Sequence, residues 1–300
     1  KYDGFPVWFM RQAGRYLPEF RKIRKKNQDF ISLCLNAELS AKISIQPLKR
    51  FDLDAAIIFS DILVVPYALN QKVNFLKNEG PLLNLDLEAI KKTNIQNFLK
   101  ILSPTYDAIK ILKKQLPTNK SLISFIGAPW TLLVYMFNKK SPKGNFSLKE
   151  FLLHESELNF VLNILEIYLK KHLDKQIEAG ADVIQIFDSW AGLLNTNKEK
   201  LQRYCYEPII KLVKHIKSKK VPVICFPRGI GNNYIDFVNK VKPDCISIDN
   251  KVDPGWAKKN FNNIPIQGGL DPKVLLFKKK EEIKSRVLRY LETFKNYPYI

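Results

Sequence analysis

Short apolar segments recur along this chain, and longer amphipathic segments separate them. Residues 55–59, Ala-Ala-Ile-Ile-Phe, are typical, because no polar residue interrupts them. A continuous apolar run indicates a parallel strand that is covered on both faces, whereas a strand with one wet face alternates. We expect such strands over residues 6–10, 54–60, 122–127, 182–187, 222–226, 245–249 and 264–267, with an eighth beginning at Tyr299.

The segments between these strands have the periodicity of helices. Residues 155–179 carry apolar side chains three and four positions apart, and Gly180 is suited to end that helix. Asn36 can cap a helix that runs from residue 37 to about residue 51. Further helices are expected over 88–101, 104–115, 197–219, 232–241 and 279–295, and loops over 64–86 and 138–150.

Eight parallel strands that alternate with helices over 300 residues are the pattern of a (β/α)₈ TIM barrel, an α/β fold. A doubly wound open sheet is the alternative, but no GxGxxG follows the first expected strand. No repeat or linker divides the chain, so residues 1–300 are predicted to form one domain. Because the sequence stops where the eighth strand begins, we expect the natural protein to continue past Ile300 and to close the barrel there.

The net charge of +20 raises the possibility of nucleic-acid binding. The lysines, however, are spread over the whole chain, and no nucleic-acid-binding motif accompanies them, so we expect neither a nucleic-acid partner nor a membrane partner. The four Cys form no CxxC and the three His have no metal-ligand spacing. These features predict reduced thiols, a cytoplasmic protein and no metal site.

Arginine is scarce and unevenly placed. The chain has 49 Lys plus Arg but only nine Arg, and four of the nine lie within the first 24 residues. Arg11 and Arg15 follow the first expected strand. A guanidinium is always charged and binds carboxylate or phosphate through a planar fork. This segment is therefore predicted to bind an anion, the alternative being a solvated basic helix end.

Polar residues also follow other expected strands. Asp61 follows the second strand, Tyr135 lies one turn into the helix after the third, and Asp188 and Ser189 follow the fourth. Each alone is more often a helix cap or a core residue. Because barrel enzymes carry their chemistry where strands end, the group predicts a pocket for a large, flat ligand with several negative charges.

Several motifs resemble the uroporphyrinogen decarboxylase family. The resemblance covers essentially the whole chain, and its first two blocks are the most specific. The matching segments are Pro6-Val7-Trp8-Phe9-Met10-Arg11-Gln12-Ala13-Gly14-Arg15-Tyr16-Leu17-Pro18-Glu19, Gln46-Pro47-Leu48 with residues 51–66, Gly127-Ala128-Pro129-Trp130-Thr131, Gln185-Ile186-Phe187-Asp188-Ser189-Trp190-Ala191-Gly192 and Phe226-Pro227-Arg228-Gly229.

The resemblance implies a homodimeric carboxy-lyase of haem (porphyrin) biosynthesis that works without a cofactor. Such an enzyme removes the four acetate carboxyls of uroporphyrinogen III as CO₂ and yields coproporphyrinogen III. It also implies catalytic roles for Asp61, Arg11 and Tyr135. Carried over by motif, the substrate-binding residues are Arg11, Gln12, Ala13, Gly14, Arg15, Arg24, Asp61, Tyr135 and Ser189.

The chemistry of these residue types agrees with that activity. Eight substrate carboxylates explain a concentration of Arg, and one carboxylate can accept hydrogen bonds from the inward pyrrole N–H groups. Decarboxylation of a pyrrole acetate first protonates the ring, and a fixed anion stabilises the resulting cation. Asp61 is the expected anion.

The chain departs from the family pattern in three places. Family members carry a Gly-His-Gly segment after the last strand, and its His is a substrate ligand, whereas this sequence stops at Ile300. Gly269 stands where the family usually has Asn, and Asn250 where it usually has Trp. We expect the two loop changes to leave the activity unaltered.

Two other functions compete with this interpretation. A corrinoid-dependent methyltransferase on the same fold would bind zinc through Cys and His, and Cys225 and Cys245 are the only Cys at late strands here. A basic nucleic-acid-binding protein is the second, and its binding would vanish with modest salt.

Arg11 and Arg15 are predicted to act through bidentate carboxylate contacts. Lys at either position keeps the charge but loses the fork, so Arg11→Lys and Arg15→Lys should lower activity nearly as much as the corresponding Ala variants. Steady-state kinetics on all four variants test this, and full activity in both Lys variants would show that charge alone suffices.

Overall fold

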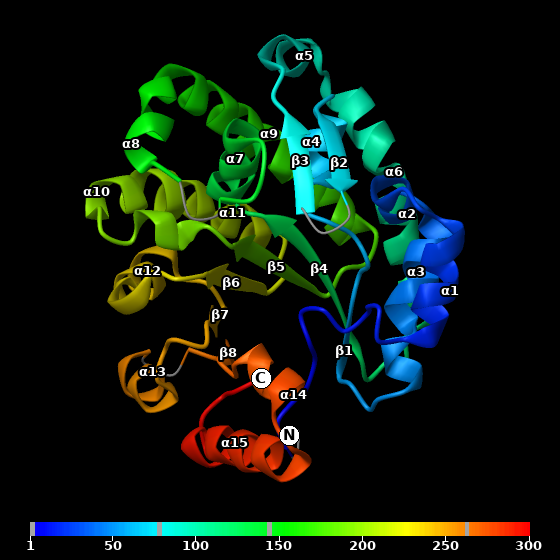
Figure 1. Ribbon diagram of the computed structural model, residues 1–300, viewed down its shortest axis with the longest axis vertical. Coiled ribbons are helices and arrows are strands. Elements are labelled where there is room, and N and C mark those ends of the chain that lie inside the picture. The colour runs from blue at the N-terminus through cyan, green and yellow to red at the C-terminus, as the bar shows by residue number, and fades with distance from the viewer. Residues whose placement is uncertain (1–3, 77–79, 143–145, 262–263) are drawn as a thin grey trace.

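The computed structural model describes residues 4–76, 80–142, 146–261 and 264–300, and it shows a single α/β domain built on a six-stranded parallel sheet (Figure 1). Neighbouring strands lie in the order β1-β4-β5-β6-β7-β8, so the sheet forms a half-barrel. The strands are β1 (Ala55–Ile57), β4 (Ser121–Gly127), β5 (Val183–Asp188), β6 (Val223–Pro227), β7 (Cys245–Ile248) and β8 (Ile266–Gly268).

The remaining described elements are mostly helices that connect these strands. They are α1 (Pro18–Lys26), α2 (Phe30–Cys34), α3 (Ala37–Ile45), η1 (Pro47–Lys49), α4 (Val64–Ala68), β2 (Lys72–Leu76), β3 (Gly80–Asn84), α5 (Leu87–Lys92), α6 (Ile95–Gln115), α7 (Pro129–Asn138), α8 (Leu148–Phe151), η2 (Leu152–His154), α9 (Glu155–Glu178), η3 (Ala191–Leu194), α10 (Lys198–Lys200), η4 (Leu201–Tyr206), α11 (Glu207–Ser218), η5 (Gly231–Asn233), α12 (Tyr234–Val241), α13 (Pro254–Asn260), α14 (Pro272–Phe277) and α15 (Lys280–Thr293).

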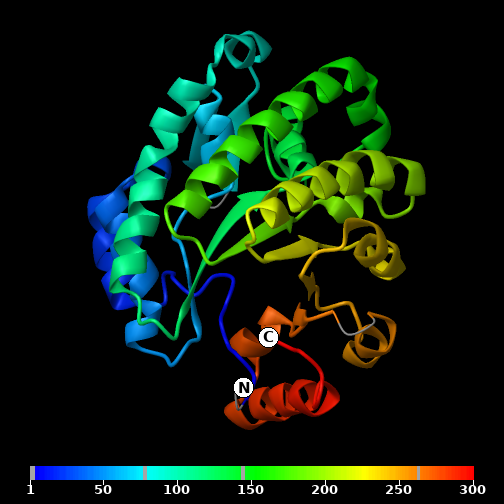
Figure 2. The same cartoon turned by 180° about the vertical axis from the view of Figure 1, so that it is seen from behind.

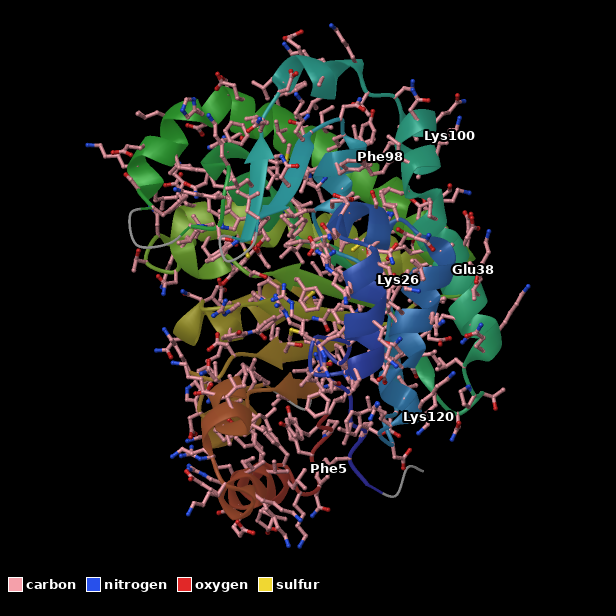
Figure 3. The ribbon with its side chains drawn as sticks, turned by 45° about the vertical axis from the view of Figure 1, so that its right-hand side comes forward. Phe5, Lys26, Glu38, Phe98, Lys100 and Lys120 are labelled. Atoms are coloured by element: carbon pink, nitrogen blue, oxygen red, sulfur yellow. The ribbon has the colours of Figure 1, made fainter. Side chains whose placement is uncertain are left out.

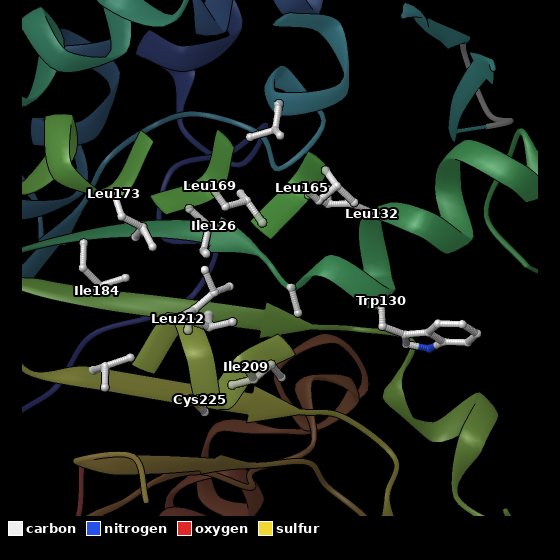
Figure 4. Packing of buried hydrophobic residues seen from close by; sticks show 14 of the residues in the cluster. Ile126, Trp130, Leu132, Leu165, Leu169, Leu173, Ile184, Ile209, Leu212 and Cys225 are labelled. Atoms are coloured by element: carbon white, nitrogen blue, oxygen red, sulfur yellow. The ribbon is translucent and has the colours of Figure 1, made fainter. Parts of the chain in front are cut away.

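Helices α6, α9 and α11 lie across one face of the sheet (Figure 2). Side chains of the strands that point to this face form the main core with them. Figure 4 shows Ile126 of β4 and Ile184 of β5 in one layer with Leu165 and Leu169 of α9. The opposite face carries a smaller apolar cluster that includes Ile57, Ile123, Phe125 and Phe187. Both faces are therefore buried, as the uninterrupted apolar strands predict.

The first expected strand, over residues 6–10, is absent, and this prediction was wrong. The chain runs beside β1, but only Val7 pairs with it: the Val7 N–H donates to Asp54 Oδ2 at 2.7 Å, and the Asp54 N–H donates to the Val7 carbonyl at 2.8 Å. Pro6 has no N–H to donate, and the Phe9 N–H donates to Gln12 Oε1 instead of to a strand. The side chains of Asp54 and Gln12 thus accept the backbone N–H groups that a strand would donate to a neighbouring strand.

The last described residues lie beside β8. Tyr299 pairs in parallel with Ile266, and the Ile300 N–H donates to the Ile266 carbonyl at 2.9 Å. The Tyr299 ring packs edge-on against Phe5, with 6.0 Å between centroids, so the two ends of the chain adjoin. Figure 1 shows both ends at the same side of the sheet.

A polar cluster links the N-terminal segment to the far strands of the sheet. The indole N–H of Trp8 donates to Gln267 Oε1 at 3.0 Å, and Gln267 Nε2 donates to Ser247 Oγ at 2.5 Å and to Gln185 Oε1 at 3.2 Å. The N-terminal segment therefore contacts β1 through Val7 and β8 through Trp8. It lies between the two edges of the half-barrel.

Several helix predictions hold, and the bounds of others needed correction. Helix α9 ends one residue before Ala179, and Gly180 follows with φ +109°. The Asn36 side chain caps α3, but the helix stops at Ile45 because Pro47 has no N–H to donate to the Ile43 carbonyl, and η1 follows. The single helix expected over 197–219 is instead α10, the π-helix η4 and α11 in succession.

Two helices were expected over 88–101 and 104–115, and the structure also has two, but the break between them lies before residue 95 rather than at Pro104. Helix α5 ends at Lys92, and α6 continues through Pro104 to Gln115. Pro104 cannot donate to the Lys100 carbonyl, but Ser103 Oγ does so at 2.9 Å. A local side chain thus replaces the missing backbone donor and the helix persists.

Residues 64–86 were expected to be a loop, and this was wrong for most of the segment. Helix α4 is followed by an antiparallel hairpin of β2 and β3, whose register pairs Lys72 with Asn84 and Leu76 with Gly80. Residues 77–79 and, in the other expected loop, 143–145 lie outside the described residues. The rest of 138–150 holds a bridge between Lys140 and Leu82 and the short helix α8.

Positive charge is spread over the outer surface. Figure 3 shows Lys26 on α1 and Lys100 on α6 pointing outward at separate places. Other lysines pair with acids, as Lys120 does with Asp52 at 2.8 Å. Among the described residues, no helix has both the length and the apolar character needed to cross a membrane.

A buried polar network joins α6, α9 and β4. The Tyr106 hydroxyl lies 2.9 Å from His172 Nδ1, and Gln176 contacts both His172 Nε2 at 2.6 Å and Ser124 Oγ at 2.7 Å. Burial lowers the pKa of His172 to about 3. The imidazole is therefore neutral in the folded protein over the whole range in which an unfolded His titrates.

This network predicts an acid-sensitive contribution to stability. The unfolded chain binds a proton at His172 below about pH 6.5 and the folded chain does not until about pH 3, so His172 should lower the free energy of unfolding by about 1 kcal/mol per pH unit as the pH falls across that window. Two carboxyl groups whose pKa is raised by burial, Asp61 and Asp188, act in the opposite direction, so the His172 contribution is the difference in slope between the wild type and His172→Gln. Urea unfolding at pH 7 and pH 5 measures these slopes. His172→Gln should remove the contribution, whereas His154→Gln, at an exposed position, should leave the wild-type slope unchanged. Equal slopes in all three proteins would contradict the prediction.

Candidate functional site

The carboxyl ends of the parallel strands meet at one edge of the sheet, and the predicted site residues lie in the loops that leave this edge. The loop over residues 11–15 precedes α1 and is tied to β1 by Gln12. That side chain is 2% exposed; its Oε1 accepts from the Phe9 N–H at 3.1 Å and its Nε2 donates to the Ala55 carbonyl at 3.0 Å. Gln12 thus fixes the loop, including Ala13 and Gly14, on the first strand.

The arginines near the N-terminus divide into two groups. Arg21 donates to the Arg15 carbonyl at 2.8 Å, and Arg24 donates to the carbonyls of Asn27 and of Gln28, the latter at 2.6 Å. The guanidinium of Arg24 also lies over Phe30 at 5.5 Å. These two residues hold the ends of α1, and Arg24 is committed to backbone rather than to an open pocket.

Arg11 and Arg15 belong to the other group. Both are exposed, and within the described residues neither guanidinium makes a hydrogen bond or an ion pair. Arg50, by contrast, forms a bidentate pair with Glu19 at 2.6 and 2.9 Å. Two planar forks at the carboxyl edge therefore remain available for a ligand.

Asp61 follows β1 and is half-buried beside this loop. Its Oδ1 accepts from the Leu63 N–H at 2.9 Å. Burial raises the pKa of Asp61 to about 6, while the Leu63 N–H and the positive charge of Arg11 act in the opposite direction. The carboxylate is ionised at neutral pH but incompletely compensated by the protein, which leaves it able to accept further donors.

The loop after β4 closes against the Asp61 loop. A Cβ at Gly127 would lie 2.9 Å from Leu132 Cδ2 and 3.0 Å from Ile62 Cβ, so only glycine allows this approach. Tyr135 follows on α7 and is half-buried, with its ring edge-on to Trp190 at 6.1 Å. Tyr135 therefore contacts the loop after β5.

Asp188 and Ser189 point to opposite sides of the end of β5, as successive strand residues do. Ser189 lines a cavity of about 290 Å³ at the carboxyl edge. Asp188 is fully buried, and its Oδ1 accepts from Thr131 Oγ1 at 2.6 Å. Burial raises the pKa of Asp188 to about 6, and the hydrogen bonds from Thr131 and Cys205 oppose this. Asp188 therefore does not line this cavity, although it directly precedes Ser189.

Asp188 instead supports the loop that carries Ser189. Thr131 Oγ1 accepts from the Trp190 N–H at 3.1 Å while donating to Asp188, and the Trp130 indole N–H donates to the Trp190 carbonyl at 2.9 Å. The chain Asp188–Thr131–Trp190 fixes the backbone next to Ser189. Sequence reasoning missed Thr131, although it lies inside a matched motif.

Sequence reasoning also missed Asp249, which organises the loops after β6 and β7. Its Oδ2 accepts from the Gly229 N–H at 2.8 Å and its Oδ1 from the Lys251 N–H at 2.9 Å. The position of Asp249, directly after a strand like that of Asp61, was the available signal. The same cavity that Ser189 lines continues to Arg228, Asn250 and Lys251.

Fold and site together define a class. This is a parallel α/β half-barrel whose carboxyl edge carries a half-buried carboxylate, two arginines without an acid partner among the described residues, and a cavity that Ser189 lines.

Comparison with known proteins identifies the family within that class. The family model described as uroporphyrinogen decarboxylase (URO-D) matches residues 1–300. The chain is 38% identical over 302 residues to the uroporphyrinogen decarboxylase of Jannaschia sp. (strain CCS1), covering 98% of this chain and 87% of that protein. It is also 38% identical over 307 residues to that of Rickettsia rickettsii (strain Sheila Smith), covering 99% and 86%. The chain belongs to the uroporphyrinogen decarboxylase family, and the family prediction is confirmed.

Solved structures with the same fold include a methyltransferase from Methanosarcina mazei, with a TM-score of 0.77 and 18% identity over 100% of this chain and 88% of that one. At this identity the likeness concerns the fold alone. Cys225 and Cys245, the zinc ligands that a methyltransferase would need, are buried, and burial raises the pKa of both thiols. Among the described residues, no group of three or more His, Cys, Asp or Glu is placed to hold a metal.

The Asp188–Thr131–Trp190 chain predicts a specific sensitivity. Thr131→Val removes the bridging hydroxyl and leaves a buried carboxyl oxygen without its donor, which should cost about 1–3 kcal/mol of unfolding free energy. Thr131→Ser should restore most of it. Thr105→Val is the matched control, because Thr105 is 2% exposed and its hydroxyl has no partner among the described residues. Chemical unfolding measures all three, and equal costs at the two positions would contradict the assignment.

Proposed function

We propose that this protein removes the four acetate carboxyls of uroporphyrinogen III as CO₂ and yields coproporphyrinogen III, as the carboxy-lyase of haem biosynthesis. The observation that carries the proposal is the half-buried Asp61 beside Arg11 at the carboxyl end of β1, in a chain that belongs to this family. The protein's own side chains and the electron-rich pyrroles of the substrate supply the chemistry.

Substrate binding follows from the charges at the edge. The forks of Arg11 and Arg15 pair with substrate carboxylates, and the backbone of Gln12, Ala13 and Gly14 forms the floor between them. Ser189 offers a hydroxyl from the opposite loop. Arg24 reaches a carboxylate only by exchanging its present bonds to the carbonyls at the end of α1.

Asp61 acts at the centre of the macrocycle. Its free carboxylate oxygen accepts the inward pyrrole N–H groups, which orients the substrate with its arms toward the arginines. Protonation of a pyrrole carbon makes the ring cationic, the bond between the acetate CH₂ and its carboxylate then breaks, and the electron pair moves into the ring as CO₂ leaves. A proton adds to the CH₂ carbon, and the ring loses the proton it gained. Asp61 stabilises the cation throughout.

Tyr135 acts from α7 in this mechanism. Its ring lies edge-on to Trp190, which directly follows Ser189 in the loop after β5. A hydroxyl there hydrogen-bonds to a reacting acetate arm, so Tyr135 complements the charge of Arg11 on the other side of Asp61.

The same proposal includes the assembly and its surroundings. The complete protein is a cytoplasmic homodimer whose residues 1–300 belong to one (β/α)₈ barrel, in which residues 6–10, although they form no strand, and residues 298–300 lie across the gap between β1 and β8. Contacts of Val7 with Asp54 and of Phe5 with Tyr299 support that closure. Exposed Phe9, Met10 and Tyr16 near the site supply an apolar surface for a second subunit.

The direct test is anaerobic incubation with uroporphyrinogen III, followed by oxidation and chromatography of the porphyrins. Conversion of the octacarboxylate to the tetracarboxylate supports the proposal. An unchanged octacarboxylate with folded, full-length protein would refute it.

Asp61→Asn keeps the size of the side chain but removes the charge that offsets the ring cation. Turnover should fall about 10²–10³-fold, as when one preorganised electrostatic group is lost. In the wild type, kcat/KM should fall as the pH drops below about 6, because protonation of Asp61 abolishes the anion. Asp52→Asn, at an exposed ion pair, is the control. Near wild-type turnover in Asp61→Asn would contradict the mechanism.

A further inference from the structure

The cavity at the carboxyl edge extends beyond the residues that the proposed mechanism uses. It has a volume of about 290 Å³, and Ser189 forms one end of its wall. From there it runs over the loops after β6 and β7, away from Asp61, to Arg228 and Lys251. Neither of these cations has a role in the mechanism above.

Arg228 has a fixed backbone and a free side chain. Its N–H donates to the Asp188 carbonyl at 3.1 Å, and its carbonyl accepts from the Gly192 N–H at 2.9 Å. A Cβ at Gly192 would lie 2.9 Å from the Gly229 carbonyl oxygen, so the two loops pack backbone on backbone. The Arg228 side chain is exposed, and within the described residues its guanidinium makes no hydrogen bond or ion pair.

Lys251 lies across the same cavity and is also exposed, with no ion pair of its ammonium in the described part of the chain. Among the described residues that line the cavity, Asp249 is the one acid, and it is 7% exposed. Its oxygens accept from the N–H groups of Gly229 and Lys251 and from the Tyr234 hydroxyl at 3.2 Å. Asp249 is thus engaged in building the loops, and both cations face the cavity without a carboxylate partner.

The order of cations and anion along the carboxyl edge of the sheet matches the positions of the carboxylates and N–H donors in the proposed substrate. Arg11 and Arg15 lie beside β1, Asp61 follows β1, and Arg228 follows β6. Strands β1, β4, β5 and β6 are consecutive neighbours, so three strand spacings of about 4.8 Å, or about 14 Å along the sheet, separate the strand that Asp61 follows from the strand that Arg228 follows. A macrocycle with donors at its centre and carboxylates on its rim fits cations at both ends and an anion between them.

We propose that Arg228 and Lys251 form a second carboxylate-binding subsite, which holds one carboxylate arm of the tetrapyrrole on the side of the macrocycle opposite to Arg11 and Arg15. This inference rests on the proposed function and adds two residues to its binding site. The planar fork of Arg228 binds the carboxylate in a bidentate way, and Lys251 adds a point charge. When both groups of cations bind carboxylate arms on opposite sides of the macrocycle, the ring stays over Asp61 while successive acetates are lost.

Kinetics with uroporphyrinogen III under anaerobic conditions test the subsite. Arg228→Gln should lower kcat/KM about 10- to 100-fold, mainly through KM, as expected for the loss of a charge-assisted pair. Partly decarboxylated porphyrins should accumulate, because a substrate held at one end dissociates between steps. Arg228→Lys should lie between the wild type and Arg228→Gln, and Lys251→Gln should shift KM in the same direction.

A second variant tests the space rather than the charge. Leu193 lines the cavity, so Leu193→Trp should fill part of it and raise KM without changing either cation. Leu153→Trp, at a position 77% exposed on η2, is the control for adding an indole. Arg286→Gln, which removes an equal charge from the Glu282 pair on α15, is the control for net charge. Both controls should keep wild-type kinetics.

The outcomes separate the subsite from the overall function. Wild-type turnover combined with unchanged kinetics in Arg228→Gln, Lys251→Gln and Leu193→Trp overturns the subsite and leaves the decarboxylase function intact. A raised KM in all three, with melting temperatures equal to that of the wild type, supports it. If the wild type does not decarboxylate uroporphyrinogen III, the proposed function fails and the subsite falls with it.

Discussion

The constraint on which this structure depends is a parallel sheet that is buried on both faces. The covered faces of such a sheet offer neither water nor a partner to a charged side chain. Polar side chains therefore gather where the strands end. In-register pairing from β1 to β8 brings all those ends to one edge. Asp61 and Asp188 show the two outcomes. Asp61 lies at the rim, where a ligand can reach it, whereas Asp188 points back into the core and needs Thr131 to be tolerated.

Rigid loops follow from the same constraint. The loops after β5, β6 and β7 are tied to one another by backbone donors, with the Gly192 N–H on the Arg228 carbonyl and the Gly229 N–H on Asp249. The loop over residues 11–15 is tied to β1 through Gln12. Most of the polar groups at the edge therefore hold the frame, and few remain for a ligand. The backbone that carries those few is held in place before a ligand binds, which favours electrostatic stabilisation of a transient cation.

The sequence predicts an element of this fold well when the pattern that specifies the element lies within the element itself. Helix α9 and strands β4 to β8 follow from periodicity alone. The N-terminal strand failed because Pro6 and the Gln12 side chain remove the donors a ladder needs. The break expected at Pro104 failed because Ser103 replaces the lost donor. Gly269 is explained only in three dimensions: its φ is +93°, and a Cβ would lie 3.0 Å from both Ile248 Cδ1 and Tyr290 Cε1.

The candidate site was predictable in kind but not in detail. Four clustered arginines indicated an anion, yet only contacts distinguish Arg21 and Arg24, which bond to carbonyls, from Arg11 and Arg15, which do not. The net charge of +20 also says little until the contacts of each cation are known. The charge of a lysine that pairs with an acid is neutralised by that acid, and a scattered surface lysine acts only through a field that salt screens. A cation fixed at the edge without an acid partner keeps its full attraction for a carboxylate. The specificity of this surface for a polyanion therefore depends on where acids are missing rather than on how many bases there are.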